Sequence, residues 1–275
     1  MTVGEVLRRA TEYLAGKGVE TPRLDAELLL GKALALSRVQ LYMDYDRPLA
    51  GPERDAFREL IRRRGEREPL AYVLGEWGFR RLTLATDRRA LVPRPETEVL
   101  VERCLALLDG LPAPRVLDVG TGTGAIALAI ADEHPGSAVT AIDVSPEALA
   151  LARENSARTG VAVELVEQDL TGGLGEAEYD LVVSNPPYVT EEEWATLQPE
   201  VRDWEPRLAT VGEDHTDEIA DHARDALRPG GHLVLEVADL RAQAVAALLE
   251  RCGYEDVTVT EDLAGRDRIV EGRRP

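Results

Sequence analysis

The sequence has few aromatic residues, few cysteines and fewer basic than acidic residues. Aromatics make up 4% of its 275 residues, so we expect a core of alanine, leucine and valine. The two cysteines, Cys104 and Cys252, lie far apart and have no metal-ligand neighbour at useful spacing, which indicates reduced core thiols and no metal site. With 32 basic against 51 acidic residues the net charge is -19, which opposes stable binding to nucleic acid.

Long apolar segments are also missing. The N-terminus carries no apolar signal segment, and no run of apolar residues reaches the length of a membrane span. We therefore expect a cytoplasmic protein with no membrane partner. An apolar content of 44% and a charged content of 30% are ordinary for a globular protein. The length allows one large domain or two smaller ones.

Residues 1–70 are predicted to be helical. Thr2-x-x-Glu5 is a capping box, Thr21-Pro22 places a cap residue before proline, and Gly51-Pro52 opens a third helix. No strand-like alternation occurs there, so we expect a small all-helical domain. Residues 71–95 mix glycine, aromatics and short β-like pieces, which predicts a hairpin or an extended linker between Tyr72 and Val92, with the hairpin linker preferred.

Residues 96–275 alternate between strand and helix patterns, which predicts an α/β domain with a mostly parallel, doubly wound sheet. Such sheets bind ligands beyond the carboxyl ends of their strands, where the strand order reverses. The expected strands are 115–119, 139–143, 163–167, 181–184, 233–236 and a closing hairpin of 257–260 and 268–271. The expected helices are 125–131, 146–155, 217–227 and 240–251.

A glycine-rich loop lies between the first of these strands and its helix, in "VLDVGTGTGAIALAIA". Gly120, Gly122 and Gly124 let a ligand approach the backbone closely. Asp143, at the end of the next strand, can hydrogen-bond both hydroxyls of a ribose. The loop could also serve tight packing alone, and its spacing fits a dinucleotide cofactor as well as S-adenosylmethionine.

Two further acids bear on that choice. Asp118, just before the loop, would repel a pyrophosphate but would favour the positive amino group of a methionine moiety. Asp169 ends the third strand and could accept a hydrogen bond from an adenine amino group, or it could be a solvated acid.

The stretch "SNPPY" follows the fourth strand, beside the same predicted pocket. The side-chain oxygen of Asn185 and the carbonyl of Pro186 can both accept hydrogen bonds from one planar NH₂ group. Those bonds would orient a poorly nucleophilic nitrogen for methylation, and proximity and alignment supply roughly 7–11 kcal/mol at best. Pro187 adds rigidity, and Tyr188 can stack on a planar target. The alternative is a rigid turn with an aromatic plug.

The chain resembles the HemK/PrmC family, the peptide chain release factor glutamine methyltransferases. The likeness is carried by "LVPRPETEVLVE", "DVGTGTGAIALAIA", "AIDVS" and "SNPPYV" and covers nearly the whole length. It implies a Rossmann-like, seven-stranded class I methyltransferase domain after the helical domain, which would dock the protein substrate. It also implies methyl transfer from S-adenosylmethionine to the glutamine amide in the Gly-Gly-Gln loop of release factors.

The resemblance assigns roles by position. The residues that would bind the cofactor are Asp118, Gly120, Thr121, Gly122, Thr123, Gly124, Asp143, Asp169, Leu170 and Asn185. The residues that would hold the glutamine are Asn185, Pro186, Pro187 and Tyr188, with Asn185, Pro186 and Tyr188 as the catalytic set. The segment 94–98 could support the pocket or simply open a helix.

The chain departs from the family after Glu205-Pro206. The family usually continues with Ala-Leu and a Gly-Gly-x-Asp-Gly-Leu run, whereas this chain reads "RLATVGEDHTDEIADHA". Because such a loop lies near the substrate, the likeness supports the cofactor more strongly than the substrate. His215 and His222, in this region, are expected to be surface residues.

Other functions remain open from the sequence. Ribosomal-protein glutamine methyltransferases share the NPPY motif, but they differ at "PRPETE". Adenine-N6 DNA methyltransferases share it too, but those usually need a basic cleft or a recognition domain. A nicotinamide oxidoreductase and a scaffold without turnover are the remaining alternatives.

Overall fold

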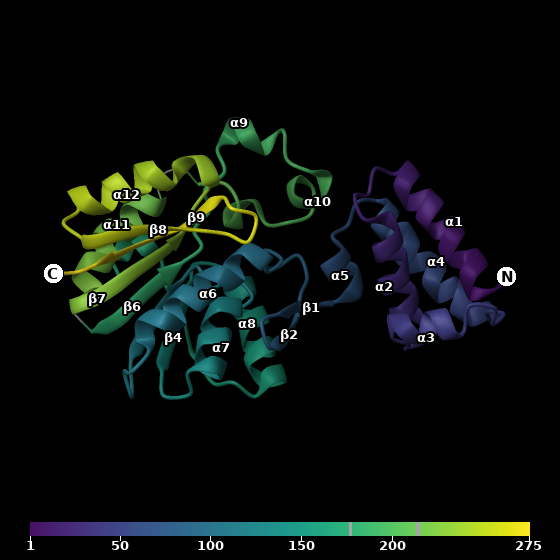
Figure 1. Ribbon diagram of the computed structural model, residues 1–275, viewed down its shortest axis with the longest axis horizontal. Helices are drawn as coiled ribbons and strands as arrows, with labels where there is room; N and C mark the ends of the chain where they lie inside the picture. The colour runs from purple at the N-terminus through teal and green to yellow at the C-terminus, as the bar shows by residue number, and fades with distance from the viewer. Residues whose placement is uncertain (176–177, 213–214) are drawn as a thin grey trace. The chain divides into compact units, whose positions relative to one another are not determined.

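The structure is a computed structural model that describes residues 1–175, 178–212 and 215–275. The described residues form two compact units (Figure 1). The first unit comprises Met1–Gly75 and Gln198–Trp204, and the second comprises Glu76–Leu197 and Glu205–Pro275. None of the helices in these ranges has the length and apolar character needed to cross a membrane.

The first unit is helical. Its helices are α1 Val3–Gly16, α2 Pro22–Leu34, α3 Arg38–Met43, α4 Gly51–Gly65, α5 Leu70–Leu74 and α10 Pro199–Arg202. The capping box of Thr2 and Glu5 is formed as expected. Thr21 makes no side-chain capping bond to α2; its hydroxyl donates to the Asp25 carboxylate. The short helix α3, which the sequence pattern did not indicate, is capped by Ser37.

A buried ion cluster ties α10 into this unit although it is remote in sequence. Arg64 is 6% exposed and pairs with Asp25 at 2.7 Å and with Glu200 at 2.9 Å. Arg67 pairs with the same Glu200 at 2.5 Å. Because these charges lie away from water, their mutual pairing is what makes their burial tolerable.

The second unit is built on one sheet. Among the described residues, seven strands run in the order β5-β4-β3-β6-β7-β9-β8. The strands are β3 Arg115–Val119, β4 Ala138–Asp143, β5 Glu164–Glu167, β6 Tyr179–Ser184, β7 Leu227–Glu236, β8 Glu255–Glu261 and β9 Asp267–Arg273. The first five pair in parallel, and β9 runs antiparallel to both β7 and β8. The strand order therefore reverses at β3 and β6.

Helices cover both faces of this sheet. They are α6 Pro95–Leu108, α7 Ala125–Glu133, α8 Pro146–Thr159, α11 His215–Ala226 and α12 Ala242–Arg251. The short helix α9 Glu191–Trp194 has no buried residue. Short 3₁₀ turns occur at Leu170–Gly172, Arg207–Ala209 and Asp239–Arg241. α6 and α7 pack over one face with Val116 and Val183, and α11 and α12 over the other with Leu117 and Val182 (Figure 1). Both faces are buried, as in parallel sheets generally.

The expected strands and helices are present with shifts of up to four residues at their ends, except that β7 begins at Leu227, six residues before the expected start and within the stretch expected to end the preceding helix. The hairpin of β1 Glu76–Phe79 and β2 Leu82–Ala85 lies in the stretch that predicted one. One expectation was wrong: Cys104 is buried in the core, but Cys252 is only half-buried and its thiol donates to Asp221. Cys252 follows the last turn of α12, which faces solvent on one side.

Candidate active site

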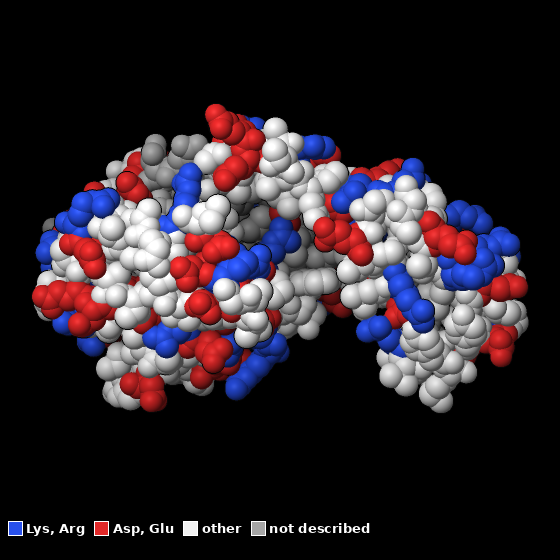
Figure 2. Space-filling model, turned by 45° about the horizontal axis from the view of Figure 1, so that its top comes forward, with Lys and Arg blue, Asp and Glu red and all other residues white. Residues whose placement is uncertain are grey.

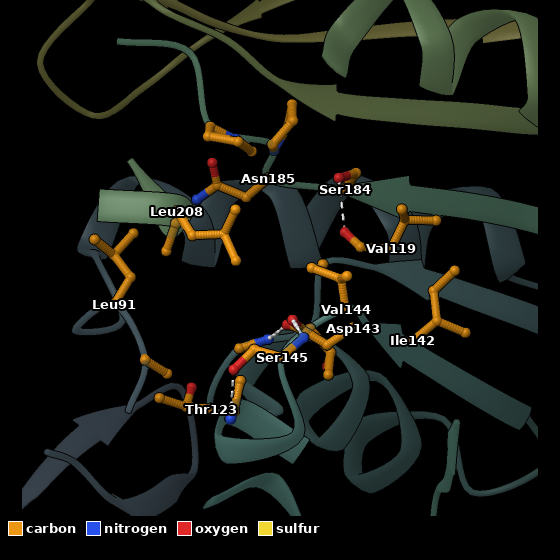
Figure 3. Close-up of a pocket in the computed structure, with 18 of the residues that line it drawn as sticks. Leu91, Val119, Thr123, Ile142, Asp143, Val144, Ser145, Ser184, Asn185 and Leu208 are labelled. Atoms are coloured by element: carbon orange, nitrogen blue, oxygen red, sulfur yellow. Dashed lines mark hydrogen bonds between the residues drawn. The ribbon is translucent and has the colours of Figure 1, made fainter. Parts of the chain in front are cut away.

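A pocket of about 430 Å³ opens in the second unit at the carboxyl ends of β3, β4 and β6. This is the point where the strand order reverses, the expected ligand site of an open parallel sheet. Its lining comes from the glycine loop, from the residues that follow β4, β5 and β6, from the segment 89–97 and from the 206–209 turn. In Figure 3, Asn185 lies above the pocket and Asp143 and Ser145 lie below it.

The glycine loop has the conformation that requires glycine. Gly120, Gly122 and Gly124 have φ values of 74°, 57° and 82°, in the left-handed region that other residues rarely adopt. A side chain built on Gly120 would meet nothing within 4 Å, although this residue lines the pocket. The empty space beside Gly120 is therefore part of the ligand volume.

The backbone of this loop is already bonded within the protein. The N–H groups of Gly120 and Thr121 both donate to the Ile142 carbonyl at 2.9 Å. The N–H of Gly122 donates to Asp143 at 2.8 Å, and that of Gly124 donates to Thr121. A pyrophosphate is bound by free N–H groups at such a loop. Because these four are engaged, they are not available to bind a pyrophosphate.

Acidic side chains surround the loop. Asp143 lines the pocket, accepts N–H bonds from Gly122 and Ser145, and has a pKa raised mainly by burial. Each carboxylate oxygen has a second lone pair, so Asp143 can still accept ligand hydroxyls. Asp169 also lines the pocket, but its Oδ1 is bonded to the N–H and hydroxyl of Thr171.

Asp118 lies beneath the loop and does not line the pocket. It is fully buried, and burial raises its pKa to about 7. Its Oδ2 accepts the Thr121 hydroxyl at 2.6 Å, whereas its Oδ1 has no hydrogen-bond partner among the described residues. A buried carboxylate of this kind favours a nearby positive charge.

The two arginines of the lining are already paired with carboxylates. Arg89 binds Asp87 and Glu154, and Arg94 places one nitrogen 2.8 and 2.7 Å from the two Glu205 oxygens. The pocket is therefore acidic on the side of the glycine loop. This charge and the engaged amides fit the positive S-adenosylmethionine better than a pyrophosphate.

The Asn185 side chain is held by a second residue of the pocket lining, Thr97. Its Nδ2 donates to the Thr97 hydroxyl at 3.2 Å, and that hydroxyl donates to Glu236 Oε2 at 2.7 Å. Thr97 is 4% exposed and Glu236 is 1% exposed. Burial raises the pKa of Glu236 to about 7. The Oδ1 of Asn185 accepts no hydrogen bond from the described residues.

The other members of the NPPY segment differ in position. Pro186 and Pro187 line the pocket, whereas Tyr188 does not. Burial, together with the nearby Glu236 carboxylate, raises the pKa of Tyr188 to about 12. Tyr188 is half-buried and follows the two prolines in the chain. A stacking contact between its ring and a ligand would require the side chain to turn into the pocket.

The structure thus brings most of the predicted residues together around one pocket, while Asp118, Gly124 and Tyr188 lie outside its lining. His215, expected at the surface, lines the pocket and lies against Gly212. Of the atypical 208–216 loop, Leu208 and Ala209 line the pocket, and positions 213–214 lie outside the described residues.

Comparison with known proteins decides the family. Residues 5–75 match the model of the PrmC N-terminal domain, and residues 96–261 match the methyltransferase small domain. A release factor glutamine methyltransferase of Geobacter sulfurreducens is 43% identical over 99% of this chain and 96% of its own. One of Deinococcus radiodurans is 45% identical over 100% of this chain and 99% of its own.

The chain belongs to the release factor glutamine methyltransferase family. Its fold is that of a class I methyltransferase. A crystallised 16S rRNA N2 methyltransferase of T. thermophilus shares this fold, with a TM-score of 0.55 and 18% identity over 73% of this chain and 50% of its own.

The "PRPETE" segment supports the pocket through contacts of two of its residues. Arg94 pairs with Glu205 and Thr97 bonds to both Asn185 and Glu236. Sequence reasoning missed Thr97 and Glu236 as site residues. The only available signal was the segment 94–98 itself, since Glu236 ends a strand whose pattern is otherwise apolar.

Proposed function

We propose that this chain transfers a methyl group from S-adenosylmethionine to the side-chain amide nitrogen of the glutamine in the Gly-Gly-Gln loop of peptide chain release factors. The observation that carries the proposal is the placement of Asn185. Asn185 lines the same pocket as the glycine loop and Asp143, and its Oδ1 accepts no hydrogen bond from the described residues.

The cofactor would be held by the glycine loop and by Asp143, with the buried Asp118 hydrogen-bonded to Thr121 of the loop. When bound, S-adenosylmethionine supplies an electrophilic methyl group on a positively charged sulfur. Asp143 would bind the ribose hydroxyls, and Leu170 with Asp169 would lie beside the adenine. These assignments rest on the pocket lining and on the family likeness.

The acceptor amide would be held by Asn185 and Pro186. A glutamine amide is a poor nucleophile because its nitrogen lone pair is delocalised into the carbonyl. Asn185 Oδ1 and the Pro186 carbonyl can each accept one N–H of the NH₂ group, which turns the nitrogen lone pair toward the methyl donor. Orientation of this kind is among the largest contributions to catalysis available to a protein. The nitrogen gains a methyl group and releases one proton to water.

We also propose that the helical unit docks the release factor. It contributes no residue to the pocket lining, and it exposes Val39 at 70% and Met43 at 80% on α3. Apolar side chains on a surface often mark a site of protein association. A Val39→Ser/Met43→Ser variant should raise the KM for release factor and leave kcat unchanged. An unchanged KM would argue against docking through α3.

Nucleic acid is a weaker candidate substrate. On the face shown in Figure 2, basic and acidic side chains are interspersed over the described surface, and the whole chain carries a charge of -19. Binding of a phosphate backbone depends on a basic surface. Ribosomal-protein glutamine remains the second candidate, because the pocket geometry would suit any exposed glutamine amide.

The test is methyl transfer from labelled S-adenosylmethionine to purified release factor and to its Gln→Ala variant in the Gly-Gly-Gln loop. Label on the first acceptor alone supports donor, acceptor and target residue together. Label on both acceptors would place the target elsewhere. Label on neither, with cofactor binding shown separately, would contradict the proposal and direct attention to ribosomal proteins and nucleic acid.

A further inference from the structure

Three buried or half-buried side chains form a hydrogen-bonded row at the wall of the pocket. Asn185 and Thr97, the latter on α6, line the pocket, and Glu236 lies outside the lining at the end of β7. The two bonds that join them measure 3.2 and 2.7 Å. Asn185 and Thr97 reach the ligand space, but the Thr97 hydroxyl is already bonded to both Asn185 and Glu236, and Glu236 can act on a ligand only through the other two.

The order of donors and acceptors in this row is fixed by chemistry. An ionised carboxylate can only accept hydrogen bonds, so the single hydroxyl hydrogen of Thr97 must point to Glu236. The Thr97 oxygen then meets Asn185 as an acceptor, and the Asn185 amide must present its NH₂ group. This leaves Asn185 Oδ1 facing away from Thr97.

We propose that Thr97 and Glu236 are positioning residues that fix which end of the Asn185 amide meets the acceptor. The inference rests on the proposed function, in which Asn185 Oδ1 accepts a hydrogen bond from the substrate NH₂ group. With the amide flipped, Asn185 would present a donor to another donor and the substrate would lose its alignment.

The row is sensitive to the protonation of Glu236. A protonated Glu236 can itself donate to Thr97. The Thr97 hydrogen is then free to turn to Asn185, and the amide can flip. The charged and titratable groups around Glu236 are Glu96 and Arg94 near α6, Arg268 on β9, and Tyr188 after β6. The two arginines favour the ionised carboxylate and oppose the effect of its burial.

The first test replaces the hydroxyl. A Thr97→Val variant keeps the shape of the side chain and removes the group that orders Asn185, so kcat for release factor should fall at least tenfold. The Kd for S-adenosylmethionine should stay within twofold, which also reports that the variant is folded. Thr97→Ser restores the hydroxyl and should recover most of the rate. A Thr97→Val enzyme with the wild-type kcat would overturn the proposal.

The second test uses pH. The wild-type kcat should fall as pH drops through the pKa of Glu236, and a Glu236→Gln variant, which carries no titrating group there, should lack this acid limb. An acid limb of the same midpoint in Glu236→Gln would contradict the proposed role.

A third readout does not depend on turnover. The side-chain amide ¹⁵N–¹H signal of Asn185, assigned by its loss in Asn185→Ala, should shift with pH in the wild-type protein and stay constant in Glu236→Gln. If wild-type protein shows this shift but methylates no release factor, the proposed function fails and the positioning pair stands. If the wild-type signal does not shift, the pair fails whatever the substrate is.

Discussion

The glycine loop allows a sharp test of where the cofactor binds, through Gly120→Ala. Gly120 has φ 74° and lines the pocket, with open space where a side chain would begin. The chain offers a matched control in Gly110, which has φ 80°, similar open space and no place in the pocket lining. The two substitutions impose the same backbone strain, but only one puts a methyl group into the ligand volume.

The expected magnitudes separate strain from obstruction. An L-residue in the left-handed region costs about 1–2 kcal/mol. Reduced freedom of the unfolded chain offsets roughly 0.4–1 kcal/mol of that cost. Both variants should therefore lose about 1 kcal/mol of stability, which corresponds to about 2–4 °C in Tm for a domain of this size. An extra methyl group in a filled site costs roughly 1–3 kcal/mol, so Gly120→Ala should weaken binding of S-adenosylmethionine about tenfold or more.

Isothermal titration calorimetry with S-adenosylmethionine and thermal melts of the two variants provide the measurements. Equal losses of Tm, with a raised Kd only in Gly120→Ala, would agree with the assigned cradle. An unchanged Kd in Gly120→Ala would refute it, because the ligand could not then occupy the space beside this glycine. A raised Kd in both variants would show that backbone strain, and not the pocket, governs affinity.

Three further predictions concern charged side chains. Asp143→Ala should weaken the binding free energy of S-adenosylmethionine by roughly 1–3 kcal/mol, because the hydrogen bonds to the ribose are lost. An unchanged Kd in calorimetry would contradict that assignment. Burial raises the pKa of Asp118 from 3.8 to about 7, so the folded chain keeps a proton that the unfolded chain loses in this interval, and stability falls as pH rises through it. Asp118→Asn should therefore reduce the fall in Tm between pH 5 and pH 8. The part of the fall that remains should come from Glu236, whose pKa is also raised to about 7. A variant whose Tm falls with pH as steeply as that of the wild type would contradict this role of Asp118. Arg64→Ala should destabilise the helical unit by about 3–5 kcal/mol in urea unfolding, because it leaves Asp25, 1% exposed, without its ion partner, and a loss below 1 kcal/mol would show that the cluster is not structural.

The sequence predicted the fold well because its strongest patterns are local. Apolar runs such as 115–119, followed by glycines and a helical repeat, specify a strand, a turn and a helix without reference to distant residues. The short helix α3 escaped prediction because its Arg38–Met43 span holds no full amphipathic repeat. The incorporation of Gln198–Trp204 into the helical unit depends on Arg64 and Arg67, more than a hundred residues away, and no local pattern carries that information.

The sequence predicted the glycine loop, the acids and the NPPY segment of the site, but it did not identify the two residues that hold Asn185. Glycines and acids at strand ends identify the pocket, and the NPPY motif identifies the acceptor side. Thr97 and Glu236 come from a helix start and a strand end that are 139 residues apart, and their relation exists only through a hydrogen bond in the folded chain. The pocket lining also excluded Tyr188, since the sequence gives the order of residues after β6 but not the direction in which each side chain turns.

The central claim is that Asn185 holds the acceptor amide while the glycine loop holds the donor. Asn185→Ala tests it most directly, with a single-turnover methyl-transfer rate on release factor and the Kd for S-adenosylmethionine measured on the same preparation. Because one oriented hydrogen-bonding group in an active site is worth roughly 10²–10³ in rate, the rate should fall by that factor while the Kd stays within twofold. A variant that keeps most of the wild-type rate, or one that loses rate and donor affinity in proportion, would contradict the account.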